Sequence, residues 1–541
     1  MLTLLKGGRV VDPANDVDAV RDVLIRDGRI VDDPGPGARP DATYDATGMV
    51  VMAGGIDLHS HIAGGKMNLA RALTPEMRGV IPPAAEVGLK YAAMGYTMAV
   101  EPAMVPSNAR QAHLEMADIP IIDRGAYAML GNDDFLLRLM LARRDHRAIA
   151  DYVGTMMAAT RALGVKVVNP GGISAFKFNT RKLELDEAGP FYGQTPRAVL
   201  HTLARALQTL GVPHPLHVHC SNLGIPGNVD TTLGTIAGAE GLPVHLTHLQ
   251  FHSYGAEGDR KFSSAASRIA EAVNAAKNVS IDVGQVMFGQ TVTASADTMA
   301  QYRNSRFARP AKFVCMDIEC DGGCGLVPFR YRSRDFVNAL QWAIGLELFL
   351  LVDDPWRVAL TTDHPNGGVF TSYPRLIRLL MDKSFRDDAL QQIEPHARAA
   401  TQLGAIKREY TLREIAILTR AGPARLLGLK DRGHLAPGAA ADITVYRPGD
   451  DAEAMFAAPA LVFKDGGLVA RDGKVLDDVL AEPPRGATHV VRPDRDRAIE
   501  RELRDWHDRH MLLSFDRFAL RDDEVGSQDR LVLHPCRPRA M

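Results

Sequence analysis

The stretch Gly54-Gly55-Ile56-Asp57-Leu58-His59-Ser60-His61 ends an apolar run with two histidines that stand two residues apart. Side chains alternate in direction along a β-strand, so a strand here would aim both imidazoles to the same side. Two imidazoles on one side suit a single metal ion, and neutral imidazole is a preferred ligand of Zn²⁺. A histidine pair at this spacing can also be a satisfied pair at a strand end. The rest of the chain therefore has to decide between these interpretations.

A lysine interrupts a second apolar segment, Ile173-Ser174-Ala175-Phe176-Lys177-Phe178. Burial favours the uncharged amine, and a neutral amine reacts with CO2 to give a carbamate, which is an anionic ligand able to bridge two metal ions. Lys177 is therefore predicted to be the bridging ligand. The alternatives are a lysine that extends from a strand edge into water, or one of the nearby Lys166 and Lys182 as the bridge.

Two further apolar runs end in residues that can bind a metal. In residues 215–222 the terminal His219 is the predicted ligand, whereas His217 lies deeper in the strand and is assigned to the core or to a contact with a ligand. In residues 358–366 an apolar strand stops at Asp363, before a turn that contains proline. An aspartate at such a place usually caps a turn. Together with the histidines and the lysine, it is predicted to be the catalytic base.

Residues 243–252 contain three candidate histidines. His248 stands where the strand should give way to a loop, and it is the predicted ligand. His252 follows four residues later, so it is better placed to touch a substrate. His245 is expected to lie low in the protein interior, away from the metal.

The chain resembles the amidohydrolase superfamily, and within it the family that comprises the hydrolase-type subunits of formylmethanofuran dehydrogenase and of the bacterial formyltransferase/hydrolase complex. The resemblance spans roughly the first 480 residues and rests on four stretches: residues 55–64 (GIDLHSHIAG), 168–177 (VNPGGISAFK), 219–224 (HCSNLG) and 247–255 (THLQFHSYG). It implies zinc-dependent hydrolysis of the N-formyl group of a formylated aminomethylfuran cofactor, formylmethanofuran or methylofuran. The products are formate and the free amine, within one-carbon metabolism.

The resemblance also implies a site with two Zn²⁺ ions. One ion is held by His59 and His61 and the other by His219 and His248, while carbamylated Lys177 bridges them and Asp363 touches one ion beside a bridging water. Candidates for substrate binding are His252, Asn222, Lys66, Asn68, Arg71 and Asn228, and a surface role is the alternative for the last four. The other subunits of a formyltransferase/hydrolase complex are the expected partners.

Length and composition fit a cytoplasmic enzyme. A chain of 541 residues with 46% hydrophobic residues can bury the core of a barrel with extra layers. A net charge of −2 gives no sign of a nucleic-acid partner, and no N-terminal apolar stretch suits secretion or a membrane. Five cysteines argue against a disulfide framework and for a reducing compartment. Abundant arginine and alanine favour the bacterial complex over the archaeal one.

Three of the cysteines, Cys315, Cys320 and Cys324, lie close together, but a cluster or structural zinc site needs a fourth soft ligand. They are therefore predicted to be buried or loop thiols, and Glu319 among them is a candidate for shaping the substrate pocket. Residues 231–235 lack the Gly-Lys-Ser/Thr ending of a phosphate-binding loop.

The order of the elements predicts an α/β fold with a TIM-type (β/α)8 barrel in residues 53–430, where helical stretches such as 196–210 and 264–276 alternate with short apolar strands. Every proposed ligand ends an apolar run, and barrel active sites lie at the carboxyl ends of the strands. A small β-sandwich is expected from residues 1–52 together with 431–480, since neither end has enough strands for a stable sheet alone. Residues 366–428 are a helical insertion.

The tail, residues 481–541, is predicted to be an arm for docking to a partner protein, because a barrel does not require this segment and yet it carries many large apolar side chains. They are Trp506, Met511, Leu512, Leu513, Phe515 and Phe518. The alternatives are a solvated charged helix and an arm that packs back on its own barrel. Two other functions also stay open. One is a cyclic amidohydrolase of the hydantoinase or dihydroorotase type, and the other is a non-catalytic scaffold, against which the full ligand set argues.

Overall fold

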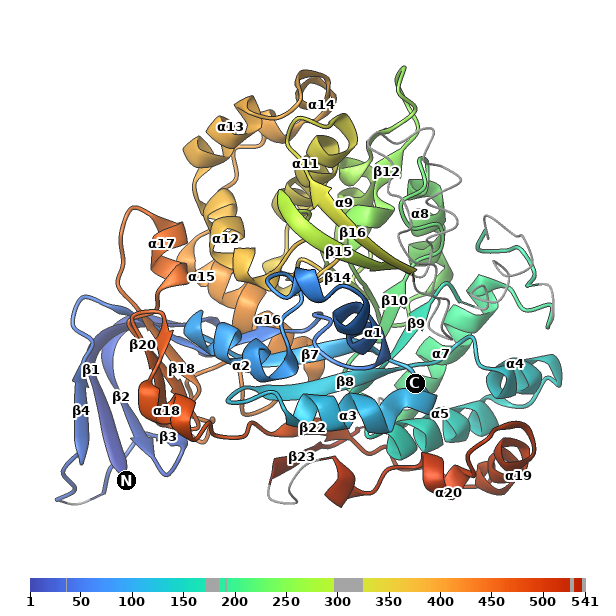
Figure 1. Ribbon diagram of the computed structural model, residues 1–541, viewed down its shortest axis with the longest axis horizontal. Helices are drawn as coiled ribbons and strands as arrows, with labels where there is room; N and C mark the ends of the chain where they lie inside the picture. The colour runs from blue at the N-terminus through green and yellow to red at the C-terminus, as the bar shows by residue number, and fades with distance from the viewer. Residues whose placement is uncertain (36, 171–183, 190–191, 296–324, 526–529, 538–541) are drawn as a thin grey trace.

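The structure is a computed structural model (Figure 1), and it describes the whole chain except residues 36, 171–183, 190–191, 296–324, 526–529 and 538–541. Several residues considered above lie outside the described part: Lys177, Lys182, Cys315, Glu319, Cys320 and Cys324. None of the described helices is long and apolar enough to cross a membrane.

Eight parallel strands within the described residues form the barrel, and all of their residues are buried. In order around the sheet they are β6 (Gly55–Asp57), β7 (Tyr96–Met104), β8 (Asp123–Met129), β9 (Gly164–Val168), β10 (Leu216–His219), β11 (Val244–Leu246), β14 (Val279–Asp282) and β17 (Val358–Ala359). An isolated parallel bridge between Ser60 and His364 joins the segments that follow the first and last strands. Full burial explains why these strands appear as continuous apolar runs in the sequence.

Helices follow most of the strands and cover the outside of the barrel (Figure 1). They include α2 (Ala84–Ala93), α3 (Ala109–Ala117), α5 (His146–Thr160), α7 (Pro196–Leu210), α8 (Val229–Gly238), α9 (Ala266–Ala275) and α11 (Phe336–Leu351). Helix α7 has clear local signals: Thr195 caps the backbone N–H of Ala198, proline occupies the first turn, and Gly211 ends the helix in the left-handed conformation. The predicted barrel fold is confirmed.

A second sheet takes strands from both ends of the chain, seen in Figure 1 as blue and orange strands side by side. Its nine described strands are β1 (Leu2–Asp12), β2 (Val17–Arg26), β3 (Arg29–Val31), β4 (Ala42–Asp45), β5 (Val50–Ala53), β18 (Ile443–Tyr446), β19 (Leu461–Lys464), β20 (Gly467–Arg471) and β21 (Lys474–Val475). The two ends meet where β5 pairs antiparallel with β18. The sheet has its own apolar core, which includes Val10, Val51, Ile443 and Phe463.

Helices also fill the region after the last barrel strand, and Figure 1 places α13 and α14 at the upper edge of the molecule, with α12 below them. They are α12 (Tyr373–Met381), α13 (Lys383–Gln391), α14 (Pro395–Ala400), α15 (Leu412–Ala416) and α16 (Gly422–Leu427). Helix α12 buries Leu376, Ile377, Leu379 and Leu380. The apolar residues of its sequence are therefore core residues of this insertion.

The C-terminal segment packs against the barrel. Strand β22 (Thr488–Val491) pairs with β8, and β23 (Leu531–His534) pairs with β22. Helix α19 (Glu500–His510) contacts α5, and the side chains of Phe515 and Phe518 are buried. The alternative in which the tail packs back on its own barrel therefore holds for part of the tail, because these apolar side chains are buried. Met511, Leu512 and Leu513 remain exposed.

A buried cluster of charges ties the three parts of the chain together. Asp123 at the start of β8 lies 3.2 Å from Lys464 Nζ of the second sheet and 2.9 Å from Arg432 Nε. Asp442 lies 3.1 Å from the same two cations, and His489 of β22 lies 3.1 Å from Asp123. Although burial alone would raise the pKa of Asp123, the ammonium of Lys464 and the guanidinium of Arg432 hold it well below its usual value.

Candidate metal centre

The described predicted ligands converge at the carboxyl ends of the barrel strands. His219 is the last residue of β10, His248 follows β11 by two residues, and Asp363 follows β17 by four. His59 and His61 lie just beyond β6, which ends at Asp57. The expectation that both stand within a strand is therefore wrong, although their rings still face a common group.

That common group is the carboxylate of Asp363. Its Oδ1 lies 3.0 Å from His59 Nε2 and 3.4 Å from His61 Nε2, and its Oδ2 accepts a hydrogen bond of 3.0 Å from Asn366 Nδ2. Asp363 is 3% exposed and has a left-handed backbone with φ of 50°. The carboxylate is therefore held between two imidazoles.

Three histidines form a second group next to the first. Any two of the rings of His219, His248 and His252 have centroids 4.5 to 5.3 Å apart, and one nitrogen of each lies within 4.8 Å of the others. Among the described residues, Nδ1 of His248 and both ring nitrogens of His252 have no hydrogen-bond partner. Burial holds the pKa of all three well below the usual value, so the rings are neutral and can offer lone pairs.

The two groups are joined through His248. Ligand atoms of His59, His248 and Asp363 also lie within 4.8 Å of one another. The site is a buried set of neutral imidazoles and one carboxylate. Among the described residues, no donor faces Nδ1 of His248 or either ring nitrogen of His252. Such a set of ligands fits borderline cations such as Zn²⁺. The geometry therefore supports a metal centre.

Glu101 is a site residue that the sequence patterns did not identify. It lies within β7, its Oε1 is 3.2 Å from His61 Nδ1, and its Oε2 accepts hydrogen bonds from the backbone N–H groups of Ile62 and Ala63. Carboxylates commonly orient histidine ligands in this way. A signal exists in the sequence, since an acid inside an otherwise apolar strand needs a partner.

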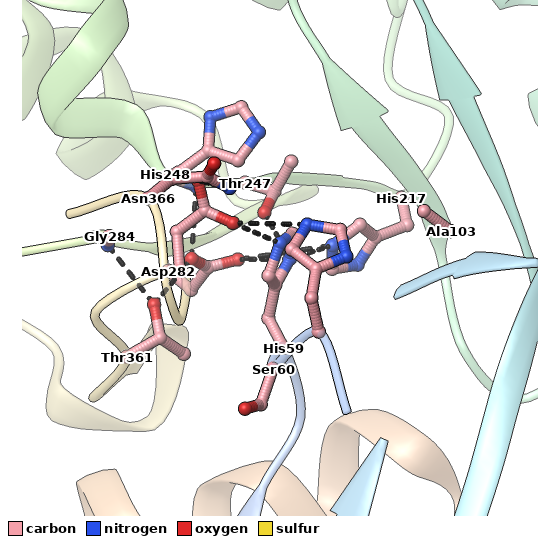
Figure 2. A network of polar contacts seen from close by, with 12 residues as sticks. His59, Ser60, Ala103, His217, Thr247, His248, Asp282, Gly284, Thr361 and Asn366 are labelled. Carbon is pink, nitrogen blue, oxygen red and sulfur yellow. Dashed lines mark hydrogen bonds and ion pairs between the residues drawn. The ribbon is translucent and has the colours of Figure 1, made fainter. Parts of the chain in front are cut away.

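Asp282 is a second site residue that the sequence patterns did not identify. It ends the apolar strand β14, much as Asp363 follows β17. Its Oδ1 accepts hydrogen bonds from the backbone N–H of His248 and from Thr361, and its Oδ2 lies 3.2 Å from His245 Nε2. Figure 2 shows the carboxylate of Asp282 beside His59 and His217. Asp282 therefore fixes the backbone of a predicted ligand.

Lys166, the rival of Lys177, lies on β9 and is 2% exposed. It pairs in register with His217, whose ring faces His59, so its side chain shares the interior face of the barrel. Burial lowers its pKa to about 8. A buried, readily deprotonated lysine therefore does lie near the ligands, while Lys177 lies outside the described residues.

Two of the substrate candidates, Lys66 and Asn68, lie in different surroundings. Lys66 is 8% exposed, and its charge contributes to the low pKa of His219. Asn68 instead lines a surface groove beside α3.

Three other candidates support the loops. Arg71 donates to the carbonyls of Ile62 and Pro82, while Asn228 donates to those of Asn222 and Phe251. The side chain of Asn222 donates to Thr231. These contacts favour a role in fixing the loops after β6, β10 and β11.

Comparison with known proteins identifies the family of the chain. A family model described as the amidohydrolase family matches residues 42–476. The chain belongs to this family. It is 49% identical over 496 residues to a subunit of the formyltransferase/hydrolase complex Fhc of Methylorubrum extorquens, with 88% of this chain and 89% of that protein covered. It is 39% identical over 514 residues to protein FwdA of Methanocaldococcus jannaschii, with 88% and 90% covered.

The fold agrees with that of a solved relative. The crystal structure of the formyltransferase/hydrolase complex FhcABCD from Methylorubrum extorquens, in complex with methylofuran, matches with a TM-score of 0.93 and 45% identity over 99% of this chain and 100% of that chain. The resemblance inferred from the four sequence stretches is thereby confirmed.

We expect His61→Ala to lose bound metal, because the substitution removes an imidazole that faces Asp363 at the centre of the site. His396→Ala is the control, since His396 has a side-chain exposure of 70% and lies outside the candidate groups. Metal content after dialysis, measured by plasma emission spectroscopy, checks this. Equal metal in His61→Ala and the unmodified protein would contradict the assignment.

Proposed function

We propose that this chain hydrolyses the N-formyl group of a formylated aminomethylfuran cofactor to formate and the free amine, using two zinc ions. The observation that carries the proposal is that His59, His61 and His248 converge on Asp363, with His219 beside His248, in a chain 49% identical to a protein of a formyltransferase/hydrolase complex. The complex that contains the solved relative was crystallised with methylofuran, which supports the same substrate class here.

The zinc ions would be held by His59 and His61, by His219 and His248, by carbamylated Lys177 and by Asp363. When bound, they would lower the pKa of water enough to supply hydroxide at neutral pH and would polarise the formyl oxygen. The sequence pattern assigns His252 to the substrate. The position of its ring beside His219 and His248 adds metal coordination as a second role for it.

In the reaction, a bond forms between water oxygen and the formyl carbon, and the C–N bond breaks. One proton of the water must reach the nitrogen, because an amide nitrogen leaves readily only when it is protonated. The Asp363 carboxylate is buried and held by Asn366 beside His59, so in its ionised form it can accept that proton and deliver it to the departing amine. Burial of the site excludes bulk water from this transfer.

We expect Asp363→Asn to keep most of the metal and to lower kcat for formate release by about 10² to 10⁴-fold, the usual worth of general acid–base catalysis. The amide keeps the shape of the carboxylate but cannot carry the proton. Formate release from a formylated aminomethylfuran is the measurement, and the exposed substitution Asp388→Asn is the control. Hydantoin is tested as an alternative substrate. Faster turnover of hydantoin than of the formylated aminomethylfuran would contradict the proposed activity and would indicate a cyclic amidohydrolase.

The bridging lysine is tested by comparing Lys177→Ala with Lys166→Met. We expect Lys177→Ala to lose metal and activity, because the carbamate contributes a negative charge and a bridge. Lys166→Met should keep both metals, since it removes a buried positive charge next to the cations. Zinc content and the response to added bicarbonate are measured. The opposite pattern would make Lys166 the bridge.

We further propose that the chain works as one component of a formyltransferase/hydrolase complex, as its relative does, and that the exposed tip Met511, Leu512 and Leu513 contacts another protein of that complex. These side chains are 48%, 106% and 52% exposed, and Leu513 lines a surface groove of about 640 Å³ together with Leu114 and Phe518. A contiguous apolar patch beside a groove favours a polypeptide partner.

The double substitution Leu512→Asp with Leu513→Asp should weaken assembly without unfolding the barrel, because both side chains are exposed in the chain alone. Light scattering of the co-expressed subunits measures the size of the assembly. Val20→Asp, at a position 72% exposed on the second sheet, is the control. An intact complex with the double variant would exclude this tip as the docking site.

A further inference from the structure

Three buried imidazoles form a continuous row from the metal centre into the barrel interior. His59 Nδ1 lies 2.8 Å from His217 Nε2, and His217 Nδ1 lies 3.1 Å from His214 Nε2. The row ends where His214 Nδ1 lies 3.1 Å from the backbone carbonyl oxygen of Leu426. All three histidines are 0% exposed, and Figure 2 shows His217 beside His59.

The carbonyl at the end of the row has a definite hydrogen-bonding direction. A carbonyl oxygen only accepts, so His214 Nδ1 must carry a hydrogen. In a neutral ring the other nitrogen, Nε2, is then bare and must accept from His217 Nδ1. His217 Nε2 is bare in turn and accepts from His59 Nδ1.

Each ring has to be neutral for this direction to hold, and the surroundings favour neutral rings. Full burial removes the hydration that a cation requires, and the neighbouring imidazoles oppose a charge.

We propose that His214 and His217 are positioning residues that fix the tautomer of His59, with the Leu426 carbonyl setting the direction of the row. His59 then carries its hydrogen on Nδ1 and presents a bare Nε2 to Asp363 at 3.0 Å. Two lone pairs that face each other at this distance repel unless a cation lies between them. The row therefore prepares His59 as a metal ligand.

The orientation of the rings is also fixed by packing. Tyr127 stacks on His214 with centroids 4.7 Å apart and an interplanar angle of 9°, and its hydroxyl donates to the carbonyl of Leu58. Thr247 Oγ1 lies 2.5 Å from His59 Nδ1, but a hydroxyl both donates and accepts, so it imposes no direction on the row.

His245 is not part of the row although it stacks on His217. Its Nδ1 faces Ser280 Oγ at 2.9 Å and its Nε2 faces Asp282. His61 is oriented differently again, by the carboxylate of Glu101. The rings of His59 and His61 are thus oriented by different groups, His59 by the row of imidazoles and His61 by the carboxylate of Glu101.

Neutron diffraction from deuterated crystals tests the row directly. The expected result is a deuteron on Nδ1 of His214, His217 and His59, with Nε2 of each ring bare. Deuterons on Nε2 of His217 and His59 would overturn the proposal. The inference rests on the metal centre of the proposed function but not on its substrate. If the protein bound no zinc the proposed function would fail, whereas the deuteron positions would still decide the row.

Variants at His214 test its effect on the metal. His214→Phe cannot accept from His217, so zinc affinity, measured by competition with a chelator, should fall about 10- to 100-fold, as is usual for groups that orient a ligand. His214→Gln offers an amide oxygen to His217 and an amide N–H to Leu426, so its affinity should stay within a few fold. His113→Phe is the control, because His113 is buried and bonds a carbonyl outside the site.

Thermal unfolding of the metal-free variants separates lost packing from lost orientation. His214→Phe and His113→Phe should lower the unfolding midpoint similarly, while only the first weakens zinc binding. Unchanged zinc affinity in a folded His214→Phe protein would overturn the proposal. If that variant fails to fold, His214→Gln and the neutron map decide, because a large loss of zinc affinity in the glutamine variant contradicts the proposal.

Discussion

The contact between Asp363 and the pair His59 and His61 closes the barrel and builds the metal centre at once. The carboxylate lies 3.0 Å and 3.4 Å from the two Nε2 atoms. The neighbouring residues carry the backbone closure, since Ser60 forms a parallel bridge with His364, and the N–H of His61 donates to the carbonyl of His364. The first and last strands of the barrel therefore meet at the site itself, so metal binding and barrel closure are expected to depend on each other.

Much of this site could be predicted from the sequence because a barrel places its strand ends on one face. His219, His248 and Asp363 each end or follow an apolar run, and this pattern predicted them once it was taken together with the other candidate ligands. Helix α7 was located equally well, since its cap, proline and terminal glycine are all local signals. His59 and His61 were placed in a strand that ends before them, because apolar residues continue past Asp57 into the buried loop.

The remaining features depend on contacts between distant segments, which local patterns do not encode. Glu101 meets His61 across strands β6 and β7, and the cluster of Asp123, Lys464 and Arg432 joins residues that are more than 300 positions apart. In the C-terminal tail, composition alone could not show which apolar residues are buried and which are exposed. Phe515 and Phe518 are buried against His507 while Leu512 is exposed, and this difference depends on tertiary packing.

The row of imidazoles also fixes the tautomer of His59 without adding a buried charge. A carboxylate beside His59 Nδ1 could fix the same tautomer, as Glu101 does for His61, but the barrel interior already holds Asp282 at 3.6 Å from that nitrogen and Asp363 on the other side of the ring. A further buried acid would be repelled by both and would raise their pKa values. A row that ends on the neutral carbonyl of Leu426 directs the lone pair of His59 without adding charge. It therefore adds no charge that would oppose ionisation of Asp363, and the ionised state is the one that the proposed proton transfer requires.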